Sequence, residues 1–134
     1  MALRIDELFG VREELSAKLK AEGLNDSDKL LAATTTPKAR EELASKLGMD
    51  SSEVLELANR SDLARIKGVG AVYSDLLEWT SVDTVAELAR RNPENLYNAI
   101  VEAANEHFVK RLPRPADVAD WVAQAKELPR ALEY

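Results

Sequence analysis

The chain has 134 residues, enough for one domain with a sizeable hydrophobic core, and a formal net charge of −6. Because it contains no cysteine and a single histidine, disulfide bonds and thiolate metal sites are excluded and a zinc site is not expected. The sequence shows no signal segment and no apolar run long enough to span a bilayer. We therefore expect a cytoplasmic protein with no membrane contact, no metal and no cofactor.

Apolar residues recur at helical spacing along nearly the whole chain, and no segment shows the alternation of a strand. In the first half we expect four helices, over residues 11–22, around Leu30, over residues 37–48 and around Val54. Gly23 and Gly48 are typical helix stops, and Thr36 followed by Pro37 is a typical helix start.

In the second half, a turn with two glycines at residues 67–70 precedes an amphipathic helix. Its expected buried face carries Val72, Leu76 and Leu77. A short helix over residues 85–89 follows, then a helix capped by Asn92, and then a final amphipathic helix that contains Trp121. The pattern predicts an all-α protein with seven to nine short helices.

Two stretches of the chain are similar to each other. An offset of 58 positions aligns Gly10 and Val11 with Gly68 and Val69. An offset of 56 positions aligns the helix start Thr36-Pro37 with the helix start Asn92-Pro93. Each copy reads as turn, helix, short helix and proline-started helix. We infer a duplication inside a single domain, residues 1–134, with halves 1–59 and 60–112 and a C-terminal helix in 113–134.

Three segments of the second half read I-K-G-V-G-A-V-Y-S-D-L-L, V-D-T-V-A-E-L-A-R-R-N-P-E-N-L and R-L-P-R-P-A-D-V-A-D-W-V-A-Q-A-K. In this order they resemble a bacterial domain-of-unknown-function family, which is similar to duplicated helix-hairpin-helix proteins. The resemblance covers nearly the whole chain and is strongest from Asp62 to Leu128. It implies a compact multi-helix domain of two divergent helix-hairpin-helix units with a C-terminal capping helix.

The glycine turn is the main candidate site. Glycine leaves the backbone unshielded, so we expect the amides of Val69, Gly70 and Ala71 to be unpaired donors at a helix N-terminus, where anions bind well. The resemblance implies that the backbone from Gly68 to Ala71 approaches a phosphate, with Val69 tucked into the protein and Lys67 adding charge. Such contacts are independent of base sequence and sensitive to salt.

Further cations flank this turn, although the segment as a whole is neutral, with eight basic and eight acidic side chains in residues 60–114. Lys110, Arg111 and Arg114 form a basic group that could extend a phosphate track or simply be a solvated linker. The predicted nucleic-acid-binding residues are Arg65, Lys67, Gly68, Val69, Gly70, Ala71, Lys110 and Arg111.

A purely structural role for the turn is the alternative, because paired glycines also let two helices pack closely. Gly68 and Gly70 should tolerate substitution poorly in either case, whereas Lys67 matters for phosphate contact alone. The first copy has Arg12 in place of the second glycine, followed by Glu13 and Glu14, so we expect it to be structural.

No catalytic motif is present, and we do not expect an enzyme. Residues 40–49 resemble the first helix of a helix-turn-helix, but the following helix is acidic and apolar where major-groove reading favours basic and amide side chains. The sequence thus favours weak, non-specific binding to a DNA or RNA backbone. The alternative is a protein-interaction adaptor or scaffold, including self-association.

Overall fold

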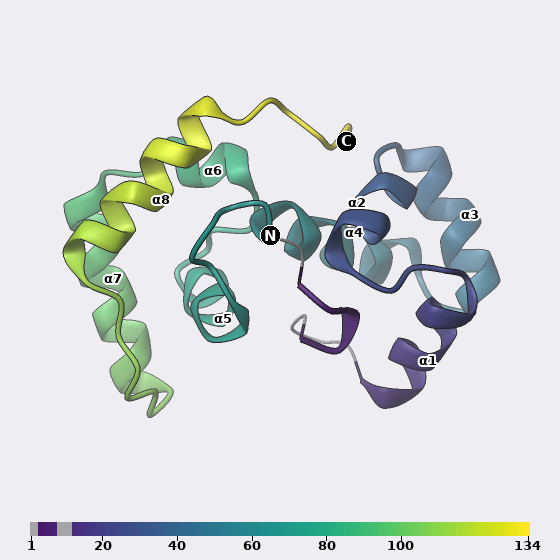
Figure 1. Ribbon diagram of the computed structural model, residues 1–134, viewed down its shortest axis with the longest axis horizontal. Coiled ribbons are helices and arrows are strands. Elements are labelled where there is room, and N and C mark those ends of the chain that lie inside the picture. Colours follow the sequence, from purple (N-terminus) through teal and green to yellow (C-terminus); the bar gives the residue numbers. More distant parts are fainter. Residues whose placement is uncertain (1–2, 8–11) are drawn as a thin grey trace. The chain divides into compact units, whose positions relative to one another are not determined.

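The computed structural model describes residues 3–7 and 12–134, which form eight α-helices, one short 3₁₀ helix and no strand (Figure 1). The predicted all-α class is confirmed. Within these residues no helix is long and apolar enough to cross a membrane. The chain divides into two compact units: unit 1 comprises Met1–Arg65 with Ala131–Tyr134, and unit 2 comprises Ile66–Arg130.

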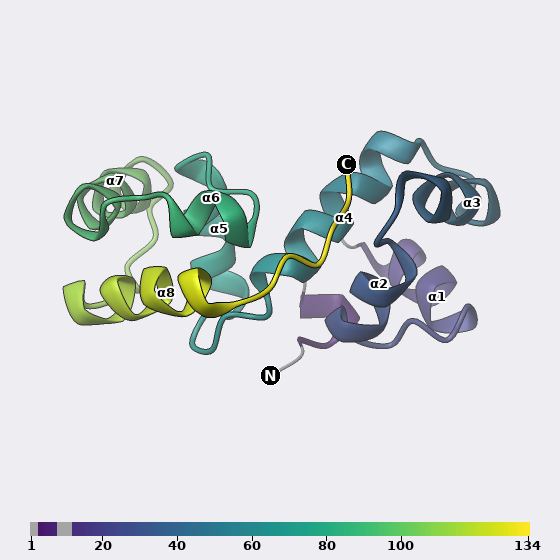
Figure 2. The same ribbon diagram turned by 90° about the horizontal axis from the view of Figure 1, so that it is seen from above.

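Unit 1 contains the 3₁₀ helix η1 (Ile5–Glu7) and the helices α1 (Glu13–Ala21), α2 (Ser27–Ala33), α3 (Pro37–Leu47) and α4 (Ser51–Leu63). Helices α2 and α3 both pack on α4, and α1 contacts α3 (Figure 2). The core of the unit consists of the buried residues Ile5, Leu19, Leu30, Leu43, Ala44, Leu47, Val54 and Leu57.

Unit 2 contains α5 (Ala71–Trp79), α6 (Val85–Ala89), α7 (Pro93–Glu106) and α8 (Pro115–Glu127). Helices α6 and α7 pack on α8, and α5 packs on α7. Leu76 and Leu77 of α5 are fully buried, as expected, but Val72 is 36% exposed and so does not belong to the buried face. Trp121 of α8 is 2% exposed and lies in the core.

The two units share one order of helices and one pattern of packing. Helices α1 and α5 have nine residues each and begin 58 positions apart, as do the starts of α2 and α6. Helices α4 and α8 have 13 residues each, and each supports the two helices before it. In this comparison α8 is the counterpart of α4, so each unit is a four-helix repeat.

Side-chain caps explain why the helices begin where they do. Asp26 and Thr84 accept a hydrogen bond from the amide three residues ahead, at the starts of α2 and α6. Thr36 and Asn92 do the same at the starts of α3 and α7, each followed by a proline in the first turn. These caps satisfy amides that would otherwise lack a partner.

Left-handed residues end the corresponding helices in both units. The chain leaves α1 through Gly23 (φ +80°) and α5 through Ser81 (φ +67°). It leaves α3 through Gly48 (φ +68°) and α7 through Phe108 (φ +57°). In all four turns the next amide donates to the carbonyl five residues earlier. Glycine suits this backbone, so the two non-glycine residues of unit 2 occupy it at a cost in free energy.

The last residues of the chain return to unit 1 and lie beside α4 (Figure 2). Arg40 of α3, which is 5% exposed, donates to the carbonyl of Thr34 at 2.8 Å and to that of Glu133 at 2.6 Å. The amide of Glu133 donates to Thr35 at 2.8 Å, and Leu132 is 2% exposed. Arg40 therefore joins the C-terminal segment to unit 1.

Replacing this arginine should destabilise unit 1. We expect Arg40→Ala to lower the free energy of unfolding by about 2–3 kcal/mol, because two carbonyl acceptors lose a charged donor in a buried position. Lys38→Ala is the matched control, since Lys38 is exposed on the same helix. Urea denaturation followed by circular dichroism measures both, and equal effects of the two changes would contradict this role.

Candidate nucleic-acid interface

The two glycines of the turn have different structural roles. Gly68 has φ +96°, and a Cβ atom there would lie 3.1 Å from Nε1 of Trp121. Both the left-handed backbone and the indole therefore require glycine at this position. Gly70 has φ −93°, and a Cβ atom there would meet no heavy atom within 4 Å. The expectation that both glycines resist substitution is wrong for Gly70.

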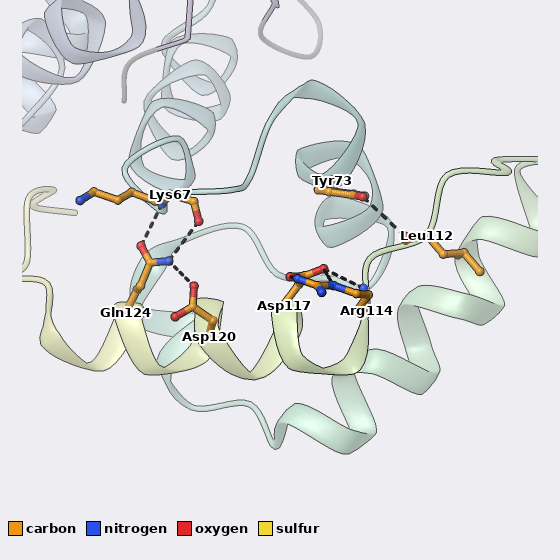
Figure 3. Close-up of polar contacts among 7 residues, drawn as sticks. All are labelled: Lys67, Tyr73, Leu112, Arg114, Asp117, Asp120 and Gln124. Atoms are coloured by element: carbon orange, nitrogen blue, oxygen red, sulfur yellow. Dashed lines mark hydrogen bonds and ion pairs between the residues drawn. The ribbon is translucent and has the colours of Figure 1, made fainter.

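Gln124 of α8 holds the turn through the backbone of Lys67. Its Oε1 accepts from the Lys67 amide at 2.8 Å, and its Nε2 donates to the Lys67 carbonyl at 3.0 Å (Figure 3). The same Nε2 also donates to Asp120 at 2.8 Å. Figure 3 shows the Lys67 side chain extending away from Gln124, and this side chain is exposed. The turn is thus fixed on α8 while the ammonium group stays in solvent.

Not all of the predicted amide donors are available. The amide of Val69 donates to the carbonyl of Ile66 at 3.2 Å, so the prediction that it is unpaired is wrong. The Val69 side chain is 3% exposed and is part of the core. The amides of Gly70 and Ala71 lie at the start of α5, whose N-cap residue, Gly70, has no side chain with which to cap the helix. A helix start of this kind favours an anion.

Tyr73 brings the basic segment to this helix start. Its hydroxyl donates to the carbonyl of Leu112 at 3.5 Å (Figure 3). The Arg111 guanidinium lies 5.2 Å from the centroid of the Tyr73 ring. On the inner side, the ring of Trp121 lies 5.2 Å from that of Tyr73. Tyr73 is in the first turn of α5, so Arg111 contacts the helix whose first amides are those of Gly70 and Ala71.

Two of the nearby arginines are already engaged with carboxylates. Arg65, the last residue of unit 1 before the turn, lies 2.8 Å from Asp62, and the two side chains are 14% and 7% exposed. Arg114 donates to Asp117 from its amide and from two guanidinium nitrogens (Figure 3). The side-chain hydrogen bond from Arg114, followed by that from its amide, lowers the pKa of Asp117 below its ordinary value. Both arginines are therefore occupied at neutral pH.

Among the predicted cations of unit 2, Lys67, Lys110 and Arg111 are exposed, as is Arg114 in its ion pair with Asp117. Lys67 is bound beside Gln124, and the other two precede Arg114 at the opposite end of α8. Ten residues of helix separate Gln124 from Arg114, which corresponds to roughly 15 Å. Exposed cations thus lie near both ends of α8, with Asp117 and Asp120 on the helix between them, and we call these two groups of cations the basic edge.

The corresponding part of unit 1 has a different character. Gly10 and Val11 lie outside the described residues, and α1 begins with Glu13 and Glu14 in its first turn. A shallow hollow elsewhere on the unit is lined by Glu41, Ala44, Ser45, Gly48, Met49, Asp50, Ser51 and Glu53. Carboxylates dominate both places, which disfavours phosphate. In the part of the chain that is described, no cluster of acidic or histidine side chains could hold a metal ion.

Sequence reasoning missed Gln124 and the contact between Tyr73 and Arg111. Gln124 follows Trp121 by three residues, and this spacing places both on one face of α8. That spacing places Gln124 beside Trp121 but does not identify the glycine turn as its partner. Nothing in the sequence pairs Tyr73 with a segment almost forty residues away.

Together these observations define an all-helical protein of two four-helix repeats with a basic edge on the second. The chain belongs to the family described as a domain of unknown function (DUF4332), whose model matches residues 10–128. The predicted membership in a domain-of-unknown-function family is thereby confirmed. No curated protein and no solved structure matches the chain.

The two glycines should respond differently to substitution by alanine. We expect Gly68→Ala to lower the free energy of unfolding by about 1–3 kcal/mol, because the new Cβ meets Trp121 in a left-handed backbone. For Gly70→Ala we expect a loss below about 1 kcal/mol, since an alanine at the helix cap has space and a favourable φ. Thermal unfolding compares the two variants directly. A loss for Gly70→Ala as large as that for Gly68→Ala would contradict the assignment.

Proposed function

We propose that unit 2 is a non-enzymatic module that binds the phosphate backbone of nucleic acid through the glycine turn and the adjacent basic segment. The single observation that carries this proposal is the contact of Arg111 with Tyr73 in the first turn of α5, a helix whose N-cap residue is a glycine with no capping side chain. An exposed guanidinium and helix N-terminal amides together form a suitable partner for a phosphate oxygen.

The proposal includes a helix-hairpin-helix role for the turn. Three features support it: a left-handed Gly68, a buried Val69 and a Lys67 side chain directed into solvent. Contacts of this kind involve backbone amides and cations and therefore do not read bases. Binding independent of sequence is the expected behaviour.

Weak binding is also expected. Unit 2 carries eight basic and ten acidic side chains, so no large positive field draws nucleic acid towards it. Affinity must come from the local group of Lys67, Lys110 and Arg111. Such an interaction is sensitive to salt, because each phosphate contact releases counterions.

Charge reversal at the turn tests the proposal. We expect a short DNA duplex to bind with a micromolar dissociation constant at low salt, and Lys67→Glu or Arg111→Glu to weaken binding about 3- to 10-fold. Each change should also reduce the slope of log K against log salt by about one, since one phosphate contact is lost. Fluorescence anisotropy at several salt concentrations measures both quantities.

Lys20→Glu is the matched control, because Lys20 is an exposed helical cation of unit 1 with the same change in charge. It should leave affinity within about twofold of the unsubstituted protein. Binding that survives Lys67→Glu and Arg111→Glu unchanged would exclude this site. The absence of any duplex binding at low salt would contradict the proposal as a whole.

A protein-interaction adaptor is the second candidate function, and exposed apolar side chains favour it. Val72 and Leu112 of unit 2 are 36% and 42% exposed. Contiguous apolar patches on a surface are typical of contact with a protein partner or a second copy, so the adaptor requires Val72 and Leu112 to belong to one such patch. Light scattering that shows a concentration-dependent dimer, dispersed by Leu112→Ser, would support the adaptor. A strict monomer would count against self-association.

A further inference from the structure

Phe108 of unit 2 has an unfavourable solvent exposure and an unfavourable backbone conformation. Phe108 is 91% exposed, although it is a large apolar residue, and its φ of +57° lies in the left-handed region. Bulky side chains rarely adopt this backbone. At the equivalent end of α3, unit 1 has Gly48 with φ +68°. Because Gly48 forms the equivalent turn after α3, the fold itself does not require a phenylalanine at the turn after α7.

The turn that carries Phe108 is well anchored. The next amide, that of Val109, donates to the carbonyl of Ala104 at 2.8 Å. The preceding residue, His107, stacks on Trp79 of α5 with ring centroids 3.8 Å apart and planes 6° from parallel. An exposed ring on an ordered turn loses little conformational freedom when it binds a ligand. The phenyl ring is therefore presented to solvent from a preorganised support.

The chain next to Phe108 supplies positive charge. Residues 107–116 contain three cations and no carboxylate, and Lys110 and Arg111 are both exposed. Arg111 follows Phe108 by three residues, a reach of at most about 10 Å along an extended chain. A ligand at the phenyl ring therefore lies within contact of the group that we propose binds phosphate.

An exposed ring beside cations is the combination that holds single-stranded nucleic acid. Each base has a flat face that stacks on an aromatic side chain, while the backbone phosphates contact the cations. In a duplex the base faces are already stacked on their neighbours, so the ring gains nothing from them. A lipid surface or a protein partner would favour a continuous apolar patch, whereas the segment around Phe108 mixes the polar His107, Lys110 and Arg111 with apolar residues.

We propose that Phe108 is a stacking platform for an unpaired base, and that unit 2 binds single-stranded nucleic acid in preference to duplex. This inference rests on the proposed function, because Lys110 and Arg111 supply the phosphate contacts in both. It explains why unit 2 keeps a phenylalanine where unit 1 has a glycine.

Phe108→Gly is the decisive variant, because it removes the ring and restores the residue that suits the backbone. Binding of oligo-dT should weaken about tenfold, within the range measured for loss of one stacked base, while binding of the matching dA–dT duplex stays within about twofold. The thermal midpoint should rise by about 2–4 °C, because relief of the left-handed strain exceeds the extra chain entropy of glycine. Weaker binding together with a higher midpoint is the expected signature.

Two further variants sharpen the test, which uses fluorescence anisotropy on the full chain. Phe108→Tyr keeps an aromatic face and should retain oligo-dT binding. Leu112→Ala removes another exposed apolar side chain of the same segment, 42% exposed, and should have no effect beyond about twofold. Oligo-rU as a parallel probe distinguishes an RNA ligand from a DNA ligand.

The outcomes separate this inference from the proposed function. Equal affinity for oligo-dT and duplex, with both weakened by Lys67→Glu and neither by Phe108→Gly, would overturn the platform and leave the phosphate site intact. Absence of binding to either probe would overturn both. Phe108-dependent binding to phosphatidylserine vesicles, with oligo-dT binding unchanged by Phe108→Gly, would assign the ring to a membrane surface and overturn the inference.

Discussion

The indole of Trp121 is the contact on which the basic edge of unit 2 depends. Its Nε1 lies 3.1 Å from the position that a Cβ of residue 68 would take, and its ring packs on Tyr73. One buried side chain thus determines the shape of the glycine turn and supports the aromatic ring over which Arg111 lies. Gln124, one turn further along α8, adds two hydrogen bonds to the Lys67 backbone. Helix α8 therefore positions the glycine turn, the first turn of α5 and the segment that contains Arg111.

The two four-helix units differ at the start of their first helix and at the turn after their third. Unit 1 places Glu13 and Glu14 in the first turn of α1, whereas α5 begins without a charged residue in its first turn. A carboxylate at a helix start satisfies the dipole internally, and its absence leaves that end available to an external anion. The turn after the third helix differs as well, with Gly48 in unit 1 and Phe108 in unit 2. The first turn of the first helix and the turn after the third helix therefore distinguish unit 2 from unit 1.

Much of the fold could be predicted from local signals. Thr36 and Asn92 mark helix starts because an oxygen-bearing cap followed by proline leaves the chain few alternatives. Apolar periodicity assigned Leu76 and Leu77 correctly to the core, but Val72 lies at the margin of the buried face and is partly exposed. Long-range contacts such as those of Gln124 were beyond prediction, because periodicity identifies the buried face of a helix but not its partner. The amide of Val69 is a related case, since its acceptor depends on the detailed geometry of the turn.

We propose that unit 2 holds a phosphate at the start of α5, with Arg111 as a second contact. Amide chemical-shift mapping by NMR during titration with a short DNA duplex measures where the phosphate binds. We expect the largest shifts at Gly70, Ala71 and Arg111, with α1 to α4 essentially unchanged. Shifts concentrated on the helices of unit 1, or none at the start of α5 while the duplex binds, would contradict it.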